Sequence, residues 1–181
     1  MQNKTDIRRE LLEARNALTA DRRASFDSTI AAKILDWWRE SSIVRLGVYW
    51  PMRGEPDLHP LYAELAVRGV ELSLPLATAN EPLRFAPWRP GEIIVRDRYG
   101  AGVPAVTRDI VQPEALLIPC VGFDTARFRL GYGGGFYDRT LAQMPRPYTI
   151  GVAYALCKTR FAVDEYDVPL DRIITDKTVL A

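Results

Sequence analysis

The segment EALLIPCVGFD (114–124) decides the fold class, because it carries the strongest strand signal in the sequence. The segment RLGYGGGFYDR (129–139) follows it and leads into a short helix predicted over 137–144. A buried strand, a glycine-rich turn and a helix in this order are typical of α/β proteins. We therefore expect an α/β fold built around residues 114–124.

Outward from this segment, predicted strands alternate with predicted helices. Apolar spacing predicts helices over 4–18, 19–41 with Thr19 as N-cap, and 58–69 ending at Gly69. Strands are predicted over 43–50, 70–77, 82–89, 148–156 and 173–181, with 70–77 and 82–89 forming a hairpin and 91–106 irregular. The alternation predicts a single domain over 1–181, in which helices flank a mostly parallel central sheet to give three layers.

Composition excludes several classes of protein. The 181 residues are 48% apolar and 26% charged, and they contain no apolar run of the roughly 20 residues needed to cross a bilayer. The first residues lack the apolar core of a signal peptide, and the cysteines Cys120 and Cys157 lie far apart. We therefore expect a cytoplasmic protein with reduced thiols and no membrane partner. The net charge of +1 predicts no broad nucleic-acid surface.

A single histidine, His59, narrows the chemistry further. It excludes HExxH zinc sites and His-rich metal centres, and we interpret it as a surface histidine in the first turn of a helix. Chemistry must then rest on carboxylates, basic residues, backbone amides and bound cofactors.

The strongest functional signal is the glycine cluster, which places four glycines in the five positions 131–135. Such a loop lets successive N–H groups point one way at the start of a helix, which suits phosphate. The spacing fits neither GxxxxGK[ST] nor GxGxxG, because Phe136 stands where the last glycine should be. The alternative, a merely flexible turn, would cost stability without return.

Carboxylates near this loop suggest a magnesium site. Asp138 lies at the start of the predicted helix, where it could cap the helix or hold Mg²⁺ against a polyphosphate. A second carboxylate is expected from the acidic segment 164–176, where Asp171 precedes a strand. Each acidic residue in that segment could equally be a solvated loop charge.

A basic row on the first helix is a candidate second wall for the phosphates. Lys4, Arg8 and Arg15 fall in one row at helical spacing, beside the apolar row. Like charges four residues apart repel unless something anionic meets them. The alternative is that these long side chains merely extend past the buried face to solvent.

The loop WPMRGEPD (50–57) leaves a predicted strand at its carboxyl end, where open α/β sheets bind ligands. Trp50, Met52 and Glu55 together could stack on a flat heterocycle and accept its N–H hydrogen bonds. A capped turn with Trp50 in the core is an equally good interpretation of this segment alone.

Taken together, these segments resemble the 5-formyltetrahydrofolate cyclo-ligase family, also called methenyltetrahydrofolate synthetases. The matching pieces run in order along nearly the whole chain: Lys4 with Arg8, YWPMRGEPD (49–57), FD (123–124), RLGYGGGFYDR (129–139), IGVAY (150–154) and PLDRIIT (169–175). The resemblance implies a Rossmann-like domain that uses ATP and Mg²⁺ to cyclise 5-formyltetrahydrofolate to 5,10-methenyltetrahydrofolate, releasing ADP and phosphate. The route it implies is phosphorylation of the formyl oxygen, followed by attack of N10. The expected partner is this small-molecule substrate, and we expect a monomer.

The resemblance also implies residue roles. The ATP-binding residues would be Lys4, Arg8, Arg129, Gly131, Tyr132, Gly133, Gly134, Gly135, Phe136, Tyr137, Asp138 and Arg139. The folate-binding residues would be Trp50, Met52 and Glu55, together with Tyr132, Gly133, Gly134, Gly135 and Phe136. Asp138 and Asp171 would bind Mg²⁺, and the catalytic residues would be Arg129, Tyr132 and Asp138.

The chain departs from the family pattern within 157–167. Many relatives have a glutamine near Cys157 and a Pro-x-Glu-x-His-Asp stretch where this chain has AVDEYD (162–167). The departure weakens the implied substrate preference and rate. Two other functions therefore stay open: an enzyme that uses the same ATP and Mg²⁺ site on another amide-bearing substrate, and a non-catalytic nucleotide- or RNA-binding module with arginines on its first helices.

Overall fold

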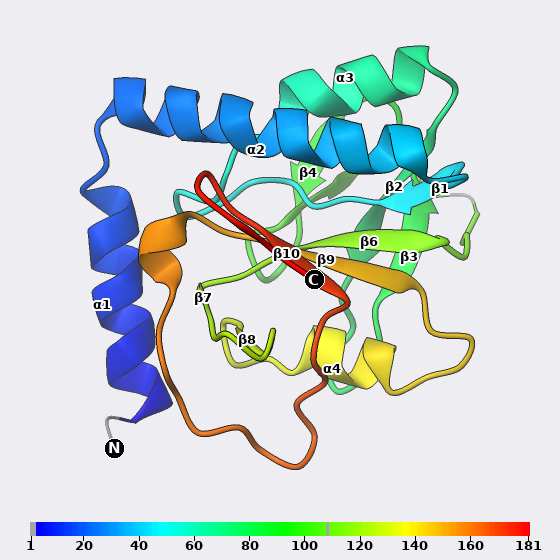
Figure 1. Ribbon diagram of the computed structural model, residues 1–181. Helices are drawn as coiled ribbons and strands as arrows, with labels where there is room; N and C mark the ends of the chain where they lie inside the picture. Colours follow the sequence, from blue (N-terminus) through cyan, green and yellow to red (C-terminus); the bar gives the residue numbers. More distant parts are fainter. Residues whose placement is uncertain (1–2, 108) are drawn as a thin grey trace.

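A seven-stranded sheet forms the centre of the computed structural model, which describes residues 3–107 and 109–181 (Figure 1). The strand order is β11-β10-β9-β6-β1-β2-β3. The strands are β1 (Arg45–Gly47), β2 (Glu71–Leu76), β3 (Arg84–Pro87), β6 (Ala115–Pro119), β9 (Tyr148–Val152), β10 (Arg172–Ile174) and β11 (Val179–Leu180). Only the edge strands β3 and β11 pair antiparallel, so the predicted mostly parallel sheet is confirmed.

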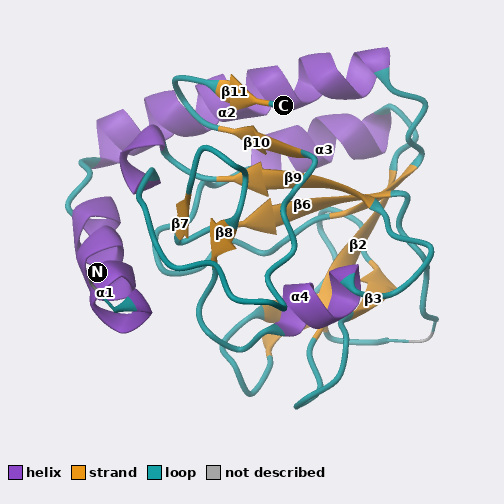
Figure 2. Cartoon of the chain, turned by 60° about the horizontal axis from the view of Figure 1, so that its bottom comes forward, coloured by secondary structure: helices purple, strands orange, loops and turns teal. Residues whose placement is uncertain are grey.

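The helices cover the two faces of this sheet. They are α1 (Lys4–Asn16), α2 (Ala20–Glu40), α3 (His59–Val67), α4 (Phe136–Leu141) and the short 3₁₀ turn η1 (Ala155–Cys157). Figure 2 shows α2 and α3 together on one side of the sheet and α4 on the other, which confirms the three predicted layers. The side chains of Asn3 and Thr19 cap α1 and α2, the second as predicted. No helix in the described part of the chain is long and apolar enough to cross a membrane.

The core lies between the sheet and α2, and β6 runs through its middle. Residues Ala115, Leu116, Leu117 and Ile118 are all buried, because both faces of this central parallel strand are covered. Ile30 and Ile34 of α2 are completely buried against the sheet, at the spacing of one helical turn. Burial on both faces therefore explains why the 114–124 signal is a continuous apolar run.

Several predicted elements are corrected in extent. The strand predicted over 43–50 is only the three residues of β1. The strand predicted over 114–124 breaks at Cys120, and its end forms β7 (Gly122–Phe123), which pairs antiparallel with β8 (Arg129–Leu130). The strand predicted over 148–156 gives way to η1 after β9. In each case the chain bends where it leaves the sheet toward the same end of the molecule.

The segment 91–106 was expected to be irregular, and this expectation is wrong. It forms a hairpin of β4 (Ile94–Arg96) and β5 (Gly102–Pro104). The turn is held by Asp97, whose Oδ1 accepts hydrogen bonds from the backbone N–H groups of Tyr99 and Ala101 at 2.8 and 2.9 Å. The strands are only three residues each, and β5 is buried throughout while β4 is mostly exposed, so neither shows an alternating apolar pattern.

The sheet has a topological switch point between β1 and β6. The strands β1 and β6 are parallel neighbours, but the chain continues from β1 to β2 on one side and from β6 to β9 on the other, so the two connections run in opposite directions. Such a point opens a crevice at the carboxyl ends of the strands. The loop that begins with Val48 and the segment that begins with Cys120 both emerge there.

Candidate functional site

A cavity of about 990 Å³ lies at this end of the sheet. Its walls come from α1, the loop after β1, the end of β2, the β4–β5 hairpin, the glycine loop with α4, and the segment 164–168. All of the predicted ATP-binding and folate-binding residues line it. Of the predicted site residues, Asp171 lies outside the lining, and so does Arg15 of the basic row.

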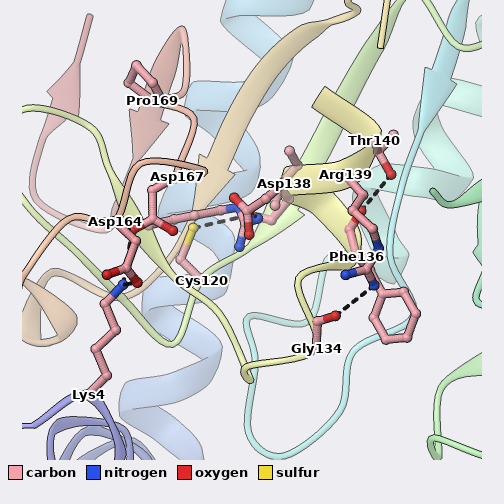
Figure 3. Close-up of polar contacts among 12 residues, drawn as sticks. Lys4, Cys120, Gly134, Phe136, Asp138, Arg139, Thr140, Asp164, Asp167 and Pro169 are labelled. Carbon is pink, nitrogen blue, oxygen red and sulfur yellow. Dashed lines mark hydrogen bonds and ion pairs between the residues drawn. The ribbon is translucent and has the colours of Figure 1, made fainter. Parts of the chain in front are cut away.

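One end of the cavity is built from cations and the glycine loop. Arg8 donates a hydrogen bond from Nε to the carbonyl of Gly131 at 2.7 Å, which ties α1 to the loop. Arg139 donates from Nη2 to the carbonyl of Gly134 at 2.7 Å, as Figure 3 shows. Lys4 and Arg129 line the same end. We refer to this end, with residues 131–139, as the phosphate end.

The loop conformation requires glycine at defined positions. Gly133 has φ +96° and Gly135 has φ +65°, a region that other residues adopt at a cost. A Cβ on Gly131 would lie 2.8 Å from Nη1 of Arg129. The helix that follows the loop, α4, has only six residues.

Arg129 and Asp138 form an ion pair inside the phosphate end. Arg129 Nη2 lies 2.7 Å from Asp138 Oδ1, and the arginine side chain is nearly buried. Its Nε is buried with no hydrogen-bond partner in the described part of the chain. Asp138 is about one-fifth exposed and can be reached from the cavity. A buried cation with spare donors beside a reachable carboxylate fits a phosphate and its Mg²⁺.

Asp171, the other predicted magnesium ligand, is engaged elsewhere. Its Oδ2 accepts hydrogen bonds from the backbone N–H and the hydroxyl of Thr149, at 2.8 and 2.7 Å, and contacts Arg146 at 3.3 Å. These bonds hold the start of β10 to β9. The structure therefore brings Asp138 into the cavity without Asp171, and the magnesium role of Asp171 stays a prediction.

Lys4 is also engaged, by the segment that departs from the family pattern. Its Nζ lies 2.5 Å from Asp164 Oδ2 and 3.0 Å from Asp167 Oδ2 (Figure 3). Partial burial lowers the pKa of Lys4, but the hydrogen bonds that Lys4 donates to these two carboxylates, together with their charges, outweigh it and raise the pKa. An incoming phosphate must compete with both carboxylates for Lys4.

The opposite end of the cavity carries aromatic residues. Trp50 packs edge-on against His59 and Trp88, with ring centroids 4.3 and 5.7 Å away. Trp50 is partly buried against the core and also lines the cavity, and its contact with a ligand stays a prediction. A Cβ on Gly102 would lie 2.4 Å from Trp50 Cγ, so the β4–β5 hairpin packs closely on the indole. His59 lies in the first turn of α3, as predicted, and its side chain is 33% exposed.

Glu55 is the buried carboxylate of this aromatic end. It is 4% exposed, and its two oxygens accept hydrogen bonds from Tyr132 Oη at 2.7 Å and from the Met52 N–H at 2.9 Å. Burial raises the pKa of Glu55, although these two bonds and the charges of Arg15 and Arg53 act to lower it. A carboxylate accepts about four hydrogen bonds, so Glu55 can accept more from a ligand. We refer to this end, with residues 50–55, as the pterin end, after the ring system of the folate that the resemblance implies as its ligand.

Sequence reasoning missed the residues that the hairpin brings to the cavity. Asp97 and Tyr99 line it, and the Tyr99 ring lies 5.1 Å from that of Phe136. A segment expected to be irregular gave no reason to place them there. Arg15 was predicted, with Lys4 and Arg8, to form a basic wall for the phosphates, and this prediction is wrong for Arg15, which is buried and does not line the cavity.

Comparisons with known proteins agree with this geometry. The sequence profile of the 5-formyltetrahydrofolate cyclo-ligase family matches residues 1–176. A Mycoplasma pneumoniae protein named 5-formyltetrahydrofolate cyclo-ligase is 29% identical over 97% of this chain and 99% of its own. The protein of that name from Escherichia coli K12 is 30% identical over 92% and 97%.

Solved structures extend the likeness to the fold. A 5,10-methenyltetrahydrofolate synthetase from Mycoplasma pneumoniae superposes with a TM-score of 0.81 at 26% identity, covering 97% of this chain and 99% of that one. The solution structure of the Aquifex aeolicus 5,10-methenyltetrahydrofolate synthetase gives 0.83 at 27% identity, covering 97% and 91%. Nearly the whole chain thus shares its fold with two structures that carry this name.

Proposed function

The chain belongs to the 5-formyltetrahydrofolate cyclo-ligase family, a family of ligases, and we propose that it cyclises 5-formyltetrahydrofolate to 5,10-methenyltetrahydrofolate with ATP and Mg²⁺. The observation that carries this proposal is the single cavity with two chemically different ends. Cations and a glycine loop at one end suit a polyphosphate, while Trp50 and buried Glu55 at the other suit a flat heterocycle with N–H donors. The cavity volume is at the upper end of the usual range for ligand sites, as two substrates require.

The reaction must make the formyl oxygen a leaving group. The N5-formyl group is an amide, whose carbon is a poor electrophile. Transfer of the γ-phosphoryl group to the formyl oxygen releases ADP, and N10 then attacks the formyl carbon. Ring closure expels the oxygen as inorganic phosphate and releases the N10 proton. The protein contributes mainly by aligning the formyl oxygen with the γ-phosphate and by stabilising the charge that develops.

The phosphate end supplies that stabilisation. In this proposal Lys4, Arg8, Arg129 and Arg139 bind the phosphates together with Gly131, Gly133, Gly134 and Gly135 of the loop. Asp138 holds Mg²⁺, which would neutralise phosphate charge, and the second ligand is predicted to be Asp171. Arg129 acts on the transferring group because it is nearly buried, and charges act more strongly where water is excluded.

The pterin end orients the folate. Glu55 accepts N–H hydrogen bonds from the ring system, and Trp50 and Met52 cover its face. Tyr132 lies between the two ends, because its hydroxyl hydrogen bonds to Glu55 while its backbone belongs to the glycine loop. We therefore propose that Tyr132 and Phe136 contact both substrates.

The experiment is direct. Purified protein is mixed with 5-formyltetrahydrofolate and MgATP, and the near-ultraviolet band of methenyltetrahydrofolate is followed, with ATP or Mg²⁺ omitted in parallel. Growth of the band that needs both supports the proposal. ATP binding without any band would instead favour a different amide-bearing substrate, and would point to the altered segment 162–167. Absence of ATP binding would contradict the proposal altogether.

A further inference from the structure

Arg15, in the last turn of α1, is the most deeply buried charged side chain among the described residues, at 1% exposure. It continues the row of Lys4 and Arg8, but those two line the cavity and Arg15 does not. Burying a guanidinium is expensive unless its N–H groups are all engaged. Packing alone therefore does not explain why a charged residue is buried at position 15.

The hydrogen bonds of Arg15 reach both ends of the cavity. Its Nε and Nη2 donate to the carbonyl of Arg53 at 3.0 and 2.7 Å, in the loop of the pterin end. Nη2 also donates to the hydroxyl of Tyr132 at 2.8 Å, in the glycine loop of the phosphate end. A longer bond of 3.5 Å runs from Nη1 to the carbonyl of Cys120, where the chain leaves β6. One side chain thus connects three segments that are far apart in the sequence.

Tyr132 passes this connection on to Glu55. The tyrosine hydroxyl accepts from Arg15 and donates to Glu55 Oε1 at 2.7 Å. The other carboxylate oxygen accepts from the Met52 N–H at 2.9 Å. Because a guanidinium only donates, the single proton of the hydroxyl is directed to Glu55. Arg15 therefore holds the Tyr132 oxygen from the side opposite to the bond with Glu55.

We propose that Arg15 is a positioning residue, which sets the separation and orientation of the pterin and phosphate ends through Tyr132 and the Arg53 carbonyl. The inference rests on the proposed function, in which Glu55 binds the folate and residues 131–139 bind the phosphates. Arg15 itself touches neither substrate. Its effect appears in the alignment of the formyl oxygen with the γ-phosphate, where small displacements are costly.

The guanidinium group is suited to this role, and an ammonium is not. Its planar fork donates several hydrogen bonds in fixed directions, and two of them converge on one carbonyl here. Lysine would keep the charge near Glu55 but could not hold Arg53 and Tyr132 together. The charge and the geometry of Arg15 can therefore be separated by substitution.

The first measurement compares Arg15→Lys and Arg15→Gln with Arg9→Gln, an exposed arginine of the same helix. For Arg15→Lys we expect kcat to fall roughly 10- to 100-fold, with the KM values for ATP and 5-formyltetrahydrofolate changing less. Arg9→Gln should leave all three parameters unchanged. A lower melting temperature with wild-type kcat in Arg15→Lys would show a merely structural role and overturn the proposal.

The second measurement is the pH dependence of kcat/KM for the folate. The charges of Arg15 and Arg53 lower the pKa of Glu55, so loss of Arg15 should move the acid limb to higher pH. Arg15→Gln should show this shift and Arg15→Lys should not. The other titratable groups that interact with Glu55 are Tyr49, Tyr62, Cys120, Tyr132 and Tyr137, whose pKa values burial raises, so they stay neutral in this range.

Tyr132→Phe provides a test should the Arg15 variants not fold. It removes the hydroxyl that joins Arg15 to Glu55 and keeps the ring, so kcat should fall in the same direction. Combined with Arg15→Lys, its effect should be markedly less than additive, because both changes break one connection. Full additivity, or wild-type kcat in Tyr132→Phe, would overturn the proposal. A wild-type protein that binds both ligands but forms no product would instead refute the proposed function, and this inference with it.

Discussion

The two ends of the cavity differ in how their charged side chains are paired and in how deeply they are buried. At the phosphate end, Lys4 pairs with Asp164, whose carboxylate is exposed to solvent. Arg129 pairs with Asp138, whose carboxylate can be reached from the cavity. At the pterin end, one carboxylate, Glu55, is buried and held by hydrogen bonds from a tyrosine and a backbone N–H. The first set of contacts can exchange partners, whereas the second is already in place.

This difference suits the chemistry of the two proposed substrates. A polyphosphate brings its own negative charge, so cations that rest against exchangeable carboxylates can be transferred to it. A neutral heterocycle brings only N–H donors, and it needs an acceptor whose position does not depend on the ligand. Substitutions at the phosphate end should therefore change turnover and salt or metal dependence, while those at the pterin end should change folate affinity.

The largest effect is expected for Asp138→Asn. Turnover should fall roughly 100-fold or more, because the substitution removes the proposed magnesium ligand and leaves buried Arg129 without its counter-ion. Turnover measured against Mg²⁺ concentration, at saturating substrates, should show a higher requirement for the metal. Folate affinity, measured by calorimetry, should hardly change.

Asp171→Asn is the matched variant for this prediction. If Asp171 is the second ligand, it should raise the Mg²⁺ requirement as Asp138→Asn does. If its bonds to Thr149 are its whole role, only the melting temperature should fall. Unchanged turnover of Asp138→Asn at low Mg²⁺ would contradict the metal role of Asp138 itself.

The next effect is expected at the other end, in Glu55→Gln. The KM for 5-formyltetrahydrofolate should rise about 10- to 100-fold, because hydrogen bonds to a charged acceptor are replaced by weaker ones. Nucleotide affinity should stay nearly unchanged. Glu114→Gln removes a carboxylate that also accepts two backbone hydrogen bonds but lies away from the cavity, and its kinetics should match the wild type. Equal loss of folate and nucleotide affinity in Glu55→Gln would indicate a folding defect.

The fold could be predicted from the sequence for those elements whose apolar pattern follows directly from which of their faces are buried. The continuous apolar run of β6 and the helical spacing of α2 each have a single physical explanation, and both elements were predicted. The β4–β5 hairpin was not, because its strands have only three residues each, and β5 is buried throughout while β4 is mostly exposed, so neither shows a period of two. Strand lengths were overestimated because apolar residues continue past the sheet into the loops that build the cavity.

The site was predictable to the extent that local sequence determines it. The glycine cluster and the WPMRGEPD loop show their character within about ten residues, and both line the cavity. The ion pairs of Lys4 with Asp164 and Asp167 join residues 160 or more positions apart, so no local sequence pattern could predict them. The same holds for Arg15, whose partners lie 38 and 117 positions away.

A smaller effect is expected for Asp164→Asn, which removes one of the two carboxylates that hold Lys4. The KM for ATP should fall about two- to fivefold, because the Asp164 side chain is 66% exposed and such pairs contribute little. The decrease should shrink at high salt, where exposed charges are screened. Glu165→Gln removes the same charge from the neighbouring position, and should leave KM closer to the wild type. A higher KM in Asp164→Asn would show that the carboxylate helps to bind the nucleotide instead of competing with it.

The smallest effect concerns stability. The contributions of Glu55 and Glu114 to the free energy of unfolding should change in opposite directions with pH. Burial raises the pKa of Glu55, so its contribution to stability is present below about pH 4.5 and is lost as the pH rises through the folded-state pKa. Hydrogen bonds from the N–H groups of Arg45 and Val44 lower the pKa of Glu114, so its contribution is present above that range and lost as the pH falls. Denaturant unfolding from pH 4 to 8 should therefore show the wild type losing stability relative to Glu55→Gln as the pH rises, by about 1.4 kcal/mol per unit of pKa shift. Relative to Glu114→Gln, the wild type should instead gain stability as the pH rises. Curves that run parallel for both variants would show that Glu55 is as well solvated as Glu114, and the pterin end would lose the preformed character that separates it from the phosphate end.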